Sequence, residues 1–257
     1  MTSAPGSAPQ QPGSKAKGGL RIVILPSTRL AAGQNSWEGW AFERAFKRAL
    51  DLTSALIGIL ILAPVCLLIS IAVMLDTPGP IFYAQERVGI NRRRARRKGH
   101  APVKERRKAD AFGRPFRIYK FRSMVVDAER HTGPVWAAAR DSRVTRVGRF
   151  LRRTRLDETP QLWNVLRGDM SLVGPRPERP TFVQSLSATI PDYPKRCGAL
   201  PGITGLAQVK SRYDTSVESA NRKLQYDLYY LKNGRILLDL KIMAATVKVM
   251  ARGDGAH

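Results

Sequence analysis

The longest apolar stretch of the chain runs from Leu52 to Leu75 and reads LTSALIGILILAPVCLLISIAVML. Its 24 residues carry no charge, and Asp51 and Asp76 bound it. A straight helix of that length would be about 36 Å long, enough to cross a hydrocarbon core of about 30 Å. A signal peptide would have a shorter apolar region and a small-residue cleavage site after it. The pattern therefore predicts a membrane segment rather than the core helix of a soluble protein.

Pro64 lies in the middle of this run, where it removes one backbone hydrogen bond and bends a helix. Lysine and arginine flank both ends, so the distribution of positive charge indicates no clear outer end. Two topologies nearly balance: a helix that enters, turns at Pro64 and leaves by the same face, and a kinked helix that crosses once. The re-entrant topology over residues 50–76 is favoured, because a single crossing would carry a basic N-terminal tail through the membrane.

Weaker patterns predict the smaller elements. Residues 1–20 are rich in Pro, Gly, Ser and Ala, which is typical of a disordered tail, and residues 21–49 include an interfacial helix with interleaved aromatic and basic residues. IFYAQERVG and FGRPFRIYKFRSM predict the two strands of a β-hairpin. Thr159 as N-cap and Pro160 as first helical residue predict a helix start, and Gly168 predicts its end.

Towards the C-terminus, Tyr226, Tyr229 and Tyr230 precede the apolar sequence ILLDLKIMAATVKVM. Helices with these residues could rest their aromatic and apolar faces among lipid headgroups. Packing in a protein core would explain the same residues nearly as well.

The charge of the chain changes the picture of its partners. The 44 Lys and Arg residues outnumber the 20 Asp and Glu residues, which gives a net charge of +24. Such an excess indicates a polyanionic partner: a nucleic acid, an anionic membrane surface or a phosphorylated substrate. The insert at residues 91–111 holds ten Lys and Arg but no aromatic residue on which a base could stack. We therefore expect the insert to contact lipid headgroups, with a plain solvated loop as the alternative, and expect no nucleic acid partner.

The candidate chemistry lies in LDETPQLWNVLRGDMSLVGPRPE. Asp157 and Glu158 precede the predicted helix start, a place that favours anions, and in isolation they would only cap the helix. However, a Gly-Pro-Arg-Pro turn carries Arg176, and PGITGLAQVKSR places Arg212 after a second turn. Arginines on stiff turns near carboxylates that hold a hard cation can form a diphosphate site. The pattern indicates phosphoryl transfer beside a membrane, in which Asp157 can attack phosphorus.

A wider resemblance supports this interpretation. The segments YAQERVG, PFRIYKFRSM, VTRVGRFLRRTRLDETPQLWNVLRGDMSLVGPRPE, PGITGLAQV and YDLYYLKNGRILLDLKIM follow one another within residues 44–252. Together they resemble the bacterial sugar transferase family, the monotopic phosphoglycosyl transferases that act on polyprenol phosphate, and the chain is similar to the small, single-module members. The resemblance implies transfer of a sugar 1-phosphate from a UDP-sugar to undecaprenyl phosphate, with release of UMP, at the start of polysaccharide or glycoconjugate assembly.

The resemblance also implies roles for individual residues. Asp157 matches the family's nucleophile, which forms a covalent aspartyl phosphosugar, and Glu158 its partner in metal binding or proton handling, with Mg²⁺ as the expected ion. Arg152, Arg176 and Arg212 match phosphate-binding positions. Lys120 and Arg122, from YKFRSM, either face the same site or lie on an exposed strand edge.

For the fold, the resemblance implies a re-entrant helix broken at a proline, which Pro64 matches, although Ala63 stands where the family often has a serine. We expect a mostly helical α+β, membrane-associated monotopic protein with one re-entrant segment and interfacial amphipathic helices around a small β-hairpin. Residues 77–252 would form the catalytic domain and residues 253–257 a tail.

The expected location is the bacterial inner membrane, with the catalytic domain on the cytoplasmic face. The expected partners are the lipid bilayer, undecaprenyl phosphate and a UDP-sugar, while a homo-oligomer stays open. An inactive membrane scaffold of the same fold and a nucleic-acid-binding membrane protein are the alternative functions.

Overall fold

The computed structural model describes residues 41–91, 112–130, 141–211 and 216–251, all within the unit Gln34–His257 of the chain. Predictions for residues 1–40, most of the basic insert, Arg212 and the C-terminal tail lie outside the described residues. The described part is mostly helical with two small two-stranded sheets, which confirms the α+β class with a helical majority. The domain boundaries stay predictions.

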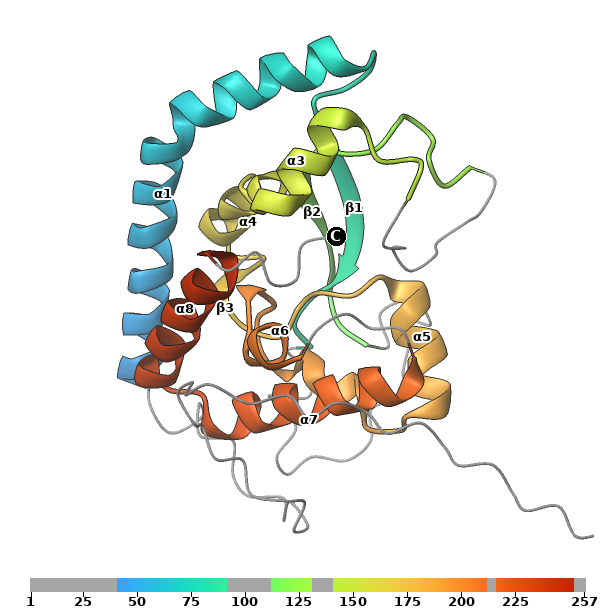
Figure 1. Ribbon diagram of the computed structural model, residues 1–257. Helices are drawn as coiled ribbons and strands as arrows, with labels where there is room; N and C mark the ends of the chain where they lie inside the picture. The colour runs from blue at the N-terminus through green and yellow to red at the C-terminus, as the bar shows by residue number, and fades with distance from the viewer. Residues whose placement is uncertain (1–40, 92–111, 131–140, 212–215, 252–257) are drawn as a thin grey trace, which may run out of the picture. The chain divides into compact units, whose positions relative to one another are not determined.

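The apolar run forms part of α1 (Ala41–Asp76), a single helix of 36 residues that contains Pro64. In Figure 1 the helix bends before it reaches β1, but helical structure continues through the bend. The predicted division into an interfacial helix and a broken membrane helix is therefore not seen in the described residues. The physical reason is that one proline removes only one N–H donor, so a long apolar helix can bend without ending.

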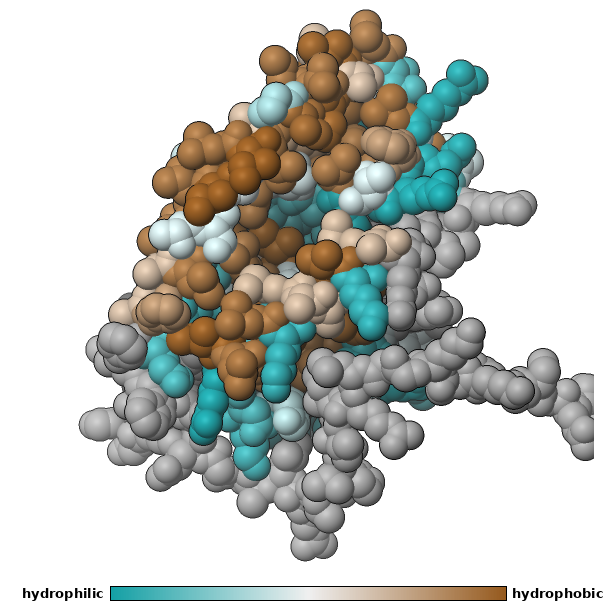
Figure 2. Space-filling view, turned by 60° about the vertical axis from the view of Figure 1, so that its left-hand side comes forward, coloured by the Kyte–Doolittle hydropathy of each residue, from teal (hydrophilic) through white to brown (hydrophobic). Residues whose placement is uncertain are grey.

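The two sides of α1 have different surroundings. Ala55, Ile69 and Val73 are buried against the rest of the protein, whereas Leu60 and Leu68 are 66% and 67% exposed. Figure 2 shows the outer side as a broad apolar surface. The segment Glu43–Asp76 is long and apolar enough to cross a membrane, and only 11% of its most apolar part is buried. Because a core helix of a soluble protein would be mostly buried, this exposure fits a lipid environment.

The hairpin forms as predicted. β1 (Phe82–Val88) pairs antiparallel with β2 (Pro115–Phe121), and Tyr83 lies opposite Lys120. A second sheet joins β3 (Ser171–Val173) and β4 (Gly202–Thr204) in parallel, where the sequence had indicated only turns. Strands of three residues are too short to show the alternation that predicts a strand.

Seven further helical elements follow α1 and the hairpin in the part of the chain that the structure describes before α8, and most are short. They are α3 (Arg146–Thr154), η1 (Leu156–Glu158), α4 (Gln161–Arg167), α5 (Pro180–Thr189), η2 (Tyr193–Gly198), α6 (Leu206–Lys210) and α7 (Val217–Asn233). α1 packs on this layer through two apolar clusters, of which one joins Ile69 and Val73 to Phe121 of β2 and Leu151 of α3. The packing sets α1 directly beside the hairpin and the helices next to the acidic pair.

The last two helices divide the aromatic and apolar residues between core and surface. Tyr230 of α7 is buried, and its hydroxyl donates to Asp239 Oδ1 at 2.8 Å, so core packing explains this tyrosine. α8 (Ile236–Ala251) instead leaves Leu237 and Val247 63% and 67% exposed. α8 therefore presents exposed apolar side chains that suit an interfacial helix, whereas α7 exposes one large apolar side chain to a lesser degree, Val217 at its first residue.

Candidate active site

The acidic pair lies on a tight turn between two helices. α3 ends at Arg155, whose left-handed φ of 62° turns the chain, and Asp157 and Glu158 follow within η1. α4 then begins at Gln161, one residue later than predicted, with Pro160 rather than Thr159 in the N-cap position. Thr159 does not act as the N-cap, because its hydroxyl donates to the carbonyl of Leu156 at 2.9 Å. The chain thus folds back over one 3₁₀ turn, which holds both carboxylates among other elements.

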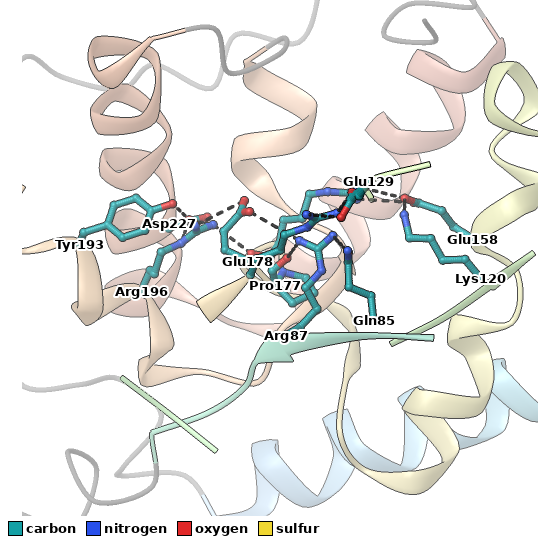
Figure 3. A network of polar contacts seen from close by, with 12 residues as sticks. Gln85, Arg87, Lys120, Glu129, Glu158, Pro177, Glu178, Tyr193, Arg196 and Asp227 are labelled. Atoms are coloured by element: carbon teal, nitrogen blue, oxygen red, sulfur yellow. Dashed lines mark hydrogen bonds and ion pairs between the residues drawn. The ribbon is translucent and has the colours of Figure 1, made fainter. Parts of the chain in front are cut away.

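Glu158 is held by two cations from distant segments. Its Oε1 accepts a hydrogen bond from Lys120 Nζ of β2 at 2.7 Å and from Arg176 Nη2 at 2.6 Å. Figure 3 shows Lys120 and Glu158 at one end of a row of polar side chains. Burial alone would raise the pKa of Glu158, but the charges and hydrogen bonds of Arg176 and Lys120 hold it well below its usual range. Glu158 is therefore an ionised group fixed in place.

Asp157 is in the opposite situation. Its side chain is buried, yet it has no hydrogen bond or ion pair with any residue that the structure describes. Burial raises the pKa of Asp157, although the charges of Lys120 and Arg152 act to lower it. A buried carboxylate with uncommitted oxygens, next to a cluster of cations, can hold a cation or attack an electrophile.

The structure brings some, but not all, of the predicted phosphate-binding residues to this pair. Lys120 and Arg176 contact Glu158 directly. Arg152 of α3 donates from Nε to Ser123 Oγ at 3.0 Å, and its charge lies close enough to act on Asp157. Arg212 lies outside the described residues, so its role stays a prediction.

Arg122 lies elsewhere. Its guanidinium donates to the carbonyls of Val73 at 3.2 Å and Pro78 at 2.6 Å, and also to Thr77 O, at the C-terminal end of α1. The structure does not bring Arg122 to the carboxylates, because β2 ends at Phe121 and the next side chain no longer follows the strand's alternation. Arg122 instead satisfies carbonyl groups that the end of a helix leaves open.

The residues that hold the backbone around Arg176 were not predicted from the sequence. Arg196 donates to the carbonyl of Arg176 at 3.0 Å and pairs with Asp227 at 2.8 Å, and Arg87 donates to the carbonyl of Pro177 at 3.1 Å. In Figure 3 Tyr193, Arg196 and Asp227 form the far end of the polar row. Arg87 and Asp227 stand in the conspicuous strings YAQERVG and YDLYY, but nothing in those strings shows that they meet.

The carboxylates fit Mg²⁺ in a particular way. No group of three or more His, Cys, Asp and Glu side chains gathers in the described part of the chain. Mg²⁺ commonly binds one or two carboxylates and completes its shell with water and substrate phosphates. Because Asp157 has uncommitted oxygens, the donor set fits an ion that is shared with a diphosphate rather than one enclosed by the protein.

Comparison with known proteins agrees with this geometry. Residues 42–253 match the family described as bacterial sugar transferase. The chain is 38% identical over 259 residues to a UDP-glucose:undecaprenyl-phosphate glucose-1-phosphate transferase of Caulobacter vibrioides, covering 96% of this chain and 87% of the relative.

Two longer relatives share only part of their length with this chain. It is 41% identical over 211 residues to a UDP-N-acetylgalactosamine-undecaprenyl-phosphate N-acetylgalactosaminephosphotransferase of Aeromonas hydrophila, covering 82% of this chain and 45% of that protein. An Escherichia coli UDP-glucose:undecaprenyl-phosphate glucose-1-phosphate transferase is 37% identical over 231 residues, with 89% and 43% covered. The chain thus spans less than half the length of these two relatives. The match over residues 42–253 shows that the chain belongs to the bacterial sugar transferase family.

Proposed function

We propose that this protein is a phosphoglycosyl transferase that moves a sugar 1-phosphate from a UDP-sugar to undecaprenyl phosphate and releases UMP. Relatives of the same family are named for UDP-sugars and undecaprenyl phosphate. The observation that carries the proposal is the contrast within the acidic pair: Glu158 is bound by two cations, and the neighbouring buried Asp157 is left without a partner among the described residues.

The proposed reaction has two steps, each with a role for this pair. An oxygen of Asp157 attacks the phosphorus that carries the sugar, the bond from that phosphorus to the bridging oxygen breaks, and UMP leaves with the electron pair. A phosphate oxygen of undecaprenyl phosphate then attacks the same phosphorus and frees the carboxylate. Lys120 and Arg176 supply positive charge for the phosphates. Mg²⁺, held by Asp157 and Glu158 with the donor's phosphates, would neutralise further charge.

A direct transfer is the alternative mechanism, with Asp157 only as a base or a metal ligand. The two-step route is favoured because a nucleophile needs an oxygen that is free to form a bond, and Asp157 has one among the described contacts. The identity of the sugar depends on pocket contacts beyond those described. The names of the relatives include both glucose and N-acetylgalactosamine, so several donors have to be compared.

The test of the function is an assay of UMP release. Membranes that contain the protein are mixed with Mg²⁺, undecaprenyl phosphate and a panel of UDP-sugars, and UMP is measured for each donor. We expect release with at least one donor and formation of a polyprenol diphosphate sugar. Absence of UMP with every donor would support an inactive scaffold of the same fold instead.

The attachment of α1 supports a re-entrant membrane segment, which we include in the proposal. Near its start, Lys47 Nζ binds Asp239 Oδ2 of α8 at 2.6 Å. Near its end, Asp76 Oδ2 accepts from Val147 N of α3 at 3.0 Å, and Arg122 donates to the carbonyl of Val73 at 3.2 Å. A helix of 36 residues is about 54 Å long if straight, so a spanning helix would place these ends on opposite membrane faces. Attachment of both ends to one domain fits a helix that returns to the face it entered, which for a UDP-sugar enzyme is the cytoplasmic face.

Cysteine labelling tests this topology. Ser36→Cys, before α1 in the chain, and Ser185→Cys, on the exposed side of α5, are introduced separately after Cys66 and Cys197 are replaced by alanine. Both sites should be protected from a membrane-impermeant thiol reagent in intact cells, and both should react after permeabilisation. Labelling of position 36 alone in intact cells would mean that α1 crosses the membrane once.

Removal of Lys120 should change the pH dependence of the activity. Asp157 must be ionised to attack, so kcat/KM should fall as the pH decreases through its pKa, which burial raises above the usual range. Since the charge of Lys120 lowers that pKa, Lys120→Met should move the acid limb of the profile to higher pH. Lys195→Gln is the matched control, because Lys195 pairs at the surface with Asp192. An unchanged acid limb in Lys120→Met would contradict the assignment of Asp157 as the titrating group.

A further inference from the structure

The turn that carries Arg176 is held by other segments rather than by itself. The four carbonyl oxygens of residues 175–178 accept hydrogen bonds from Gly202 N at 3.0 Å, Arg196 Nη2 at 3.0 Å, Arg87 Nη1 at 3.1 Å and Val88 N at 2.9 Å. Two of these donors are backbone N–H groups and two are guanidinium groups. Backbone and side-chain hydrogen bonds together therefore hold the turn in place. The prolines at 175 and 177 add fixed φ angles.

Arg196 is buried although it is charged. It is 7% exposed, and each of its three nitrogens has a partner. Nε donates to Asp227 Oδ2 at 2.9 Å, Nη1 donates to the hydroxyl of Tyr193 at 2.6 Å, and Nη2 reaches both Asp227 and the carbonyl of Arg176. Asp227, on α7, is 1% exposed and supplies the neutralising charge. One planar group therefore connects α7, η2 and the turn.

The guanidinium of Arg176, unlike its backbone, has to remain partly open to substrate. Its guanidinium contacts Glu158 at 2.6 Å, yet the side chain is 35% exposed. A group that binds a substrate phosphate has to keep donors open, so contacts at its tip cannot fix it completely. The orientation of the guanidinium therefore depends on contacts that hold the backbone of Arg176. A rigid group at that backbone lowers the entropy that is lost when the substrate binds.

We propose that Arg196, held by Asp227, is a positioning residue that sets the backbone of Arg176 and thereby aims its guanidinium at Glu158 and the donor's diphosphate. The inference rests on the proposed function for the diphosphate, but the positioning of the turn stands on the contacts alone. Lysine cannot replace Arg196 here, because one ammonium group does not offer the fork of N–H donors that meets the carboxylate, the hydroxyl and the carbonyl together.

The kinetic test compares substitutions in two backgrounds. Arg196→Lys and Asp227→Asn should each lower kcat/KM by about a hundredfold, the scale of a displacement of about 1 Å in a reacting group. In an Arg176→Lys background, where the group to be aimed is already replaced, Arg196→Lys should cost less than about a further twofold. Lys195→Gln, the neighbouring residue on η2, should keep the parent value, because its surface ion pair with Asp192 does not reach the turn. Equal costs of Arg196→Lys in both backgrounds would overturn the inference, since a merely structural role would add to the loss at Arg176.

Hydrogen exchange provides a readout that needs no activity. Peptides that cover residues 172–180 should exchange faster in Arg196→Lys and Asp227→Asn than in the parent or in Lys195→Gln, at a temperature where all four remain folded. Tyr193→Phe removes only one hydroxyl contact of Arg196 and replaces the other variants if they unfold. Unchanged exchange in these peptides would overturn the positioning role. If the parent releases no UMP with any donor, the proposed function fails, and the exchange rates alone decide the inference.

Discussion

Asp157→Asn is expected to reduce UMP release to background and to abolish any sugar phosphate bound to the protein. Asparagine keeps the shape of the side chain, but its amide oxygen is a poor nucleophile. The measurement is mass spectrometry of protein quenched after mixing with Mg²⁺ and the preferred UDP-sugar, without polyprenol phosphate. The parent should show a sugar-phosphate adduct that maps to Asp157, together with UMP.

The same variant should fold at least as stably as the parent. The pKa of Asp157 is raised in the folded protein, mainly by burial, so at neutral pH its charge opposes folding. A neutral amide removes that penalty, and the unfolding temperature should stay level or rise.

A parent that forms no adduct and releases UMP only after acceptor is added would contradict the two-step mechanism and favour direct transfer.

Glu158→Gln should lose both activity and stability. The pKa of Glu158 lies well below its usual range in the folded protein, because Arg176 and Lys120 outweigh burial. A lowered folded pKa contributes stability that is fully present above the unfolded value and is lost as the pH falls through the folded value. At neutral pH the substitution removes this contribution and leaves two cations without their anion, at a cost of about 3 kcal/mol, the lower end of the range for a broken buried pair. Arg176 is partly exposed, which is why the lower end applies.

The two acidic residues serve as controls for each other. Both changes replace a carboxylate by an amide at adjacent buried positions, yet only Glu158→Gln should lower the midpoint of denaturant unfolding. The difference in midpoint between the parent and Glu158→Gln should also shrink as the pH is lowered, because protonation of Glu158 mimics the substitution. Equal midpoints for both variants at neutral pH would contradict the division of roles.

Local patterns in the sequence determined several features of this protein. The uncharged run between Asp51 and Asp76 produced a long apolar helix, because a charge-free run of that length cannot form a surface loop. The hairpin followed from its alternating side chains, and Gly168 ended α4 with a φ of 82° that other residues rarely adopt. Asp157 and Glu158 are consecutive in the sequence, so their proximity requires no tertiary contact. Each of these features depends on neighbours within a few residues.

Tertiary packing decided what the acidic pair can do. Glu158 meets Lys120 and Arg176, which are 38 and 18 residues away, and Asp157 meets neither directly, although the sequence treats the two acids alike. Packing also placed the Arg122 side chain at the end of α1, although Arg122 follows Lys120 by only two residues in the chain. The two side chains differ because β2 ends between them. It joined Arg196 to a turn 20 residues earlier in the chain. Local periodicity and turn chemistry specify elements, but contacts between distant segments depend on how those elements pack, and the free oxygen of Asp157 is one result of that packing.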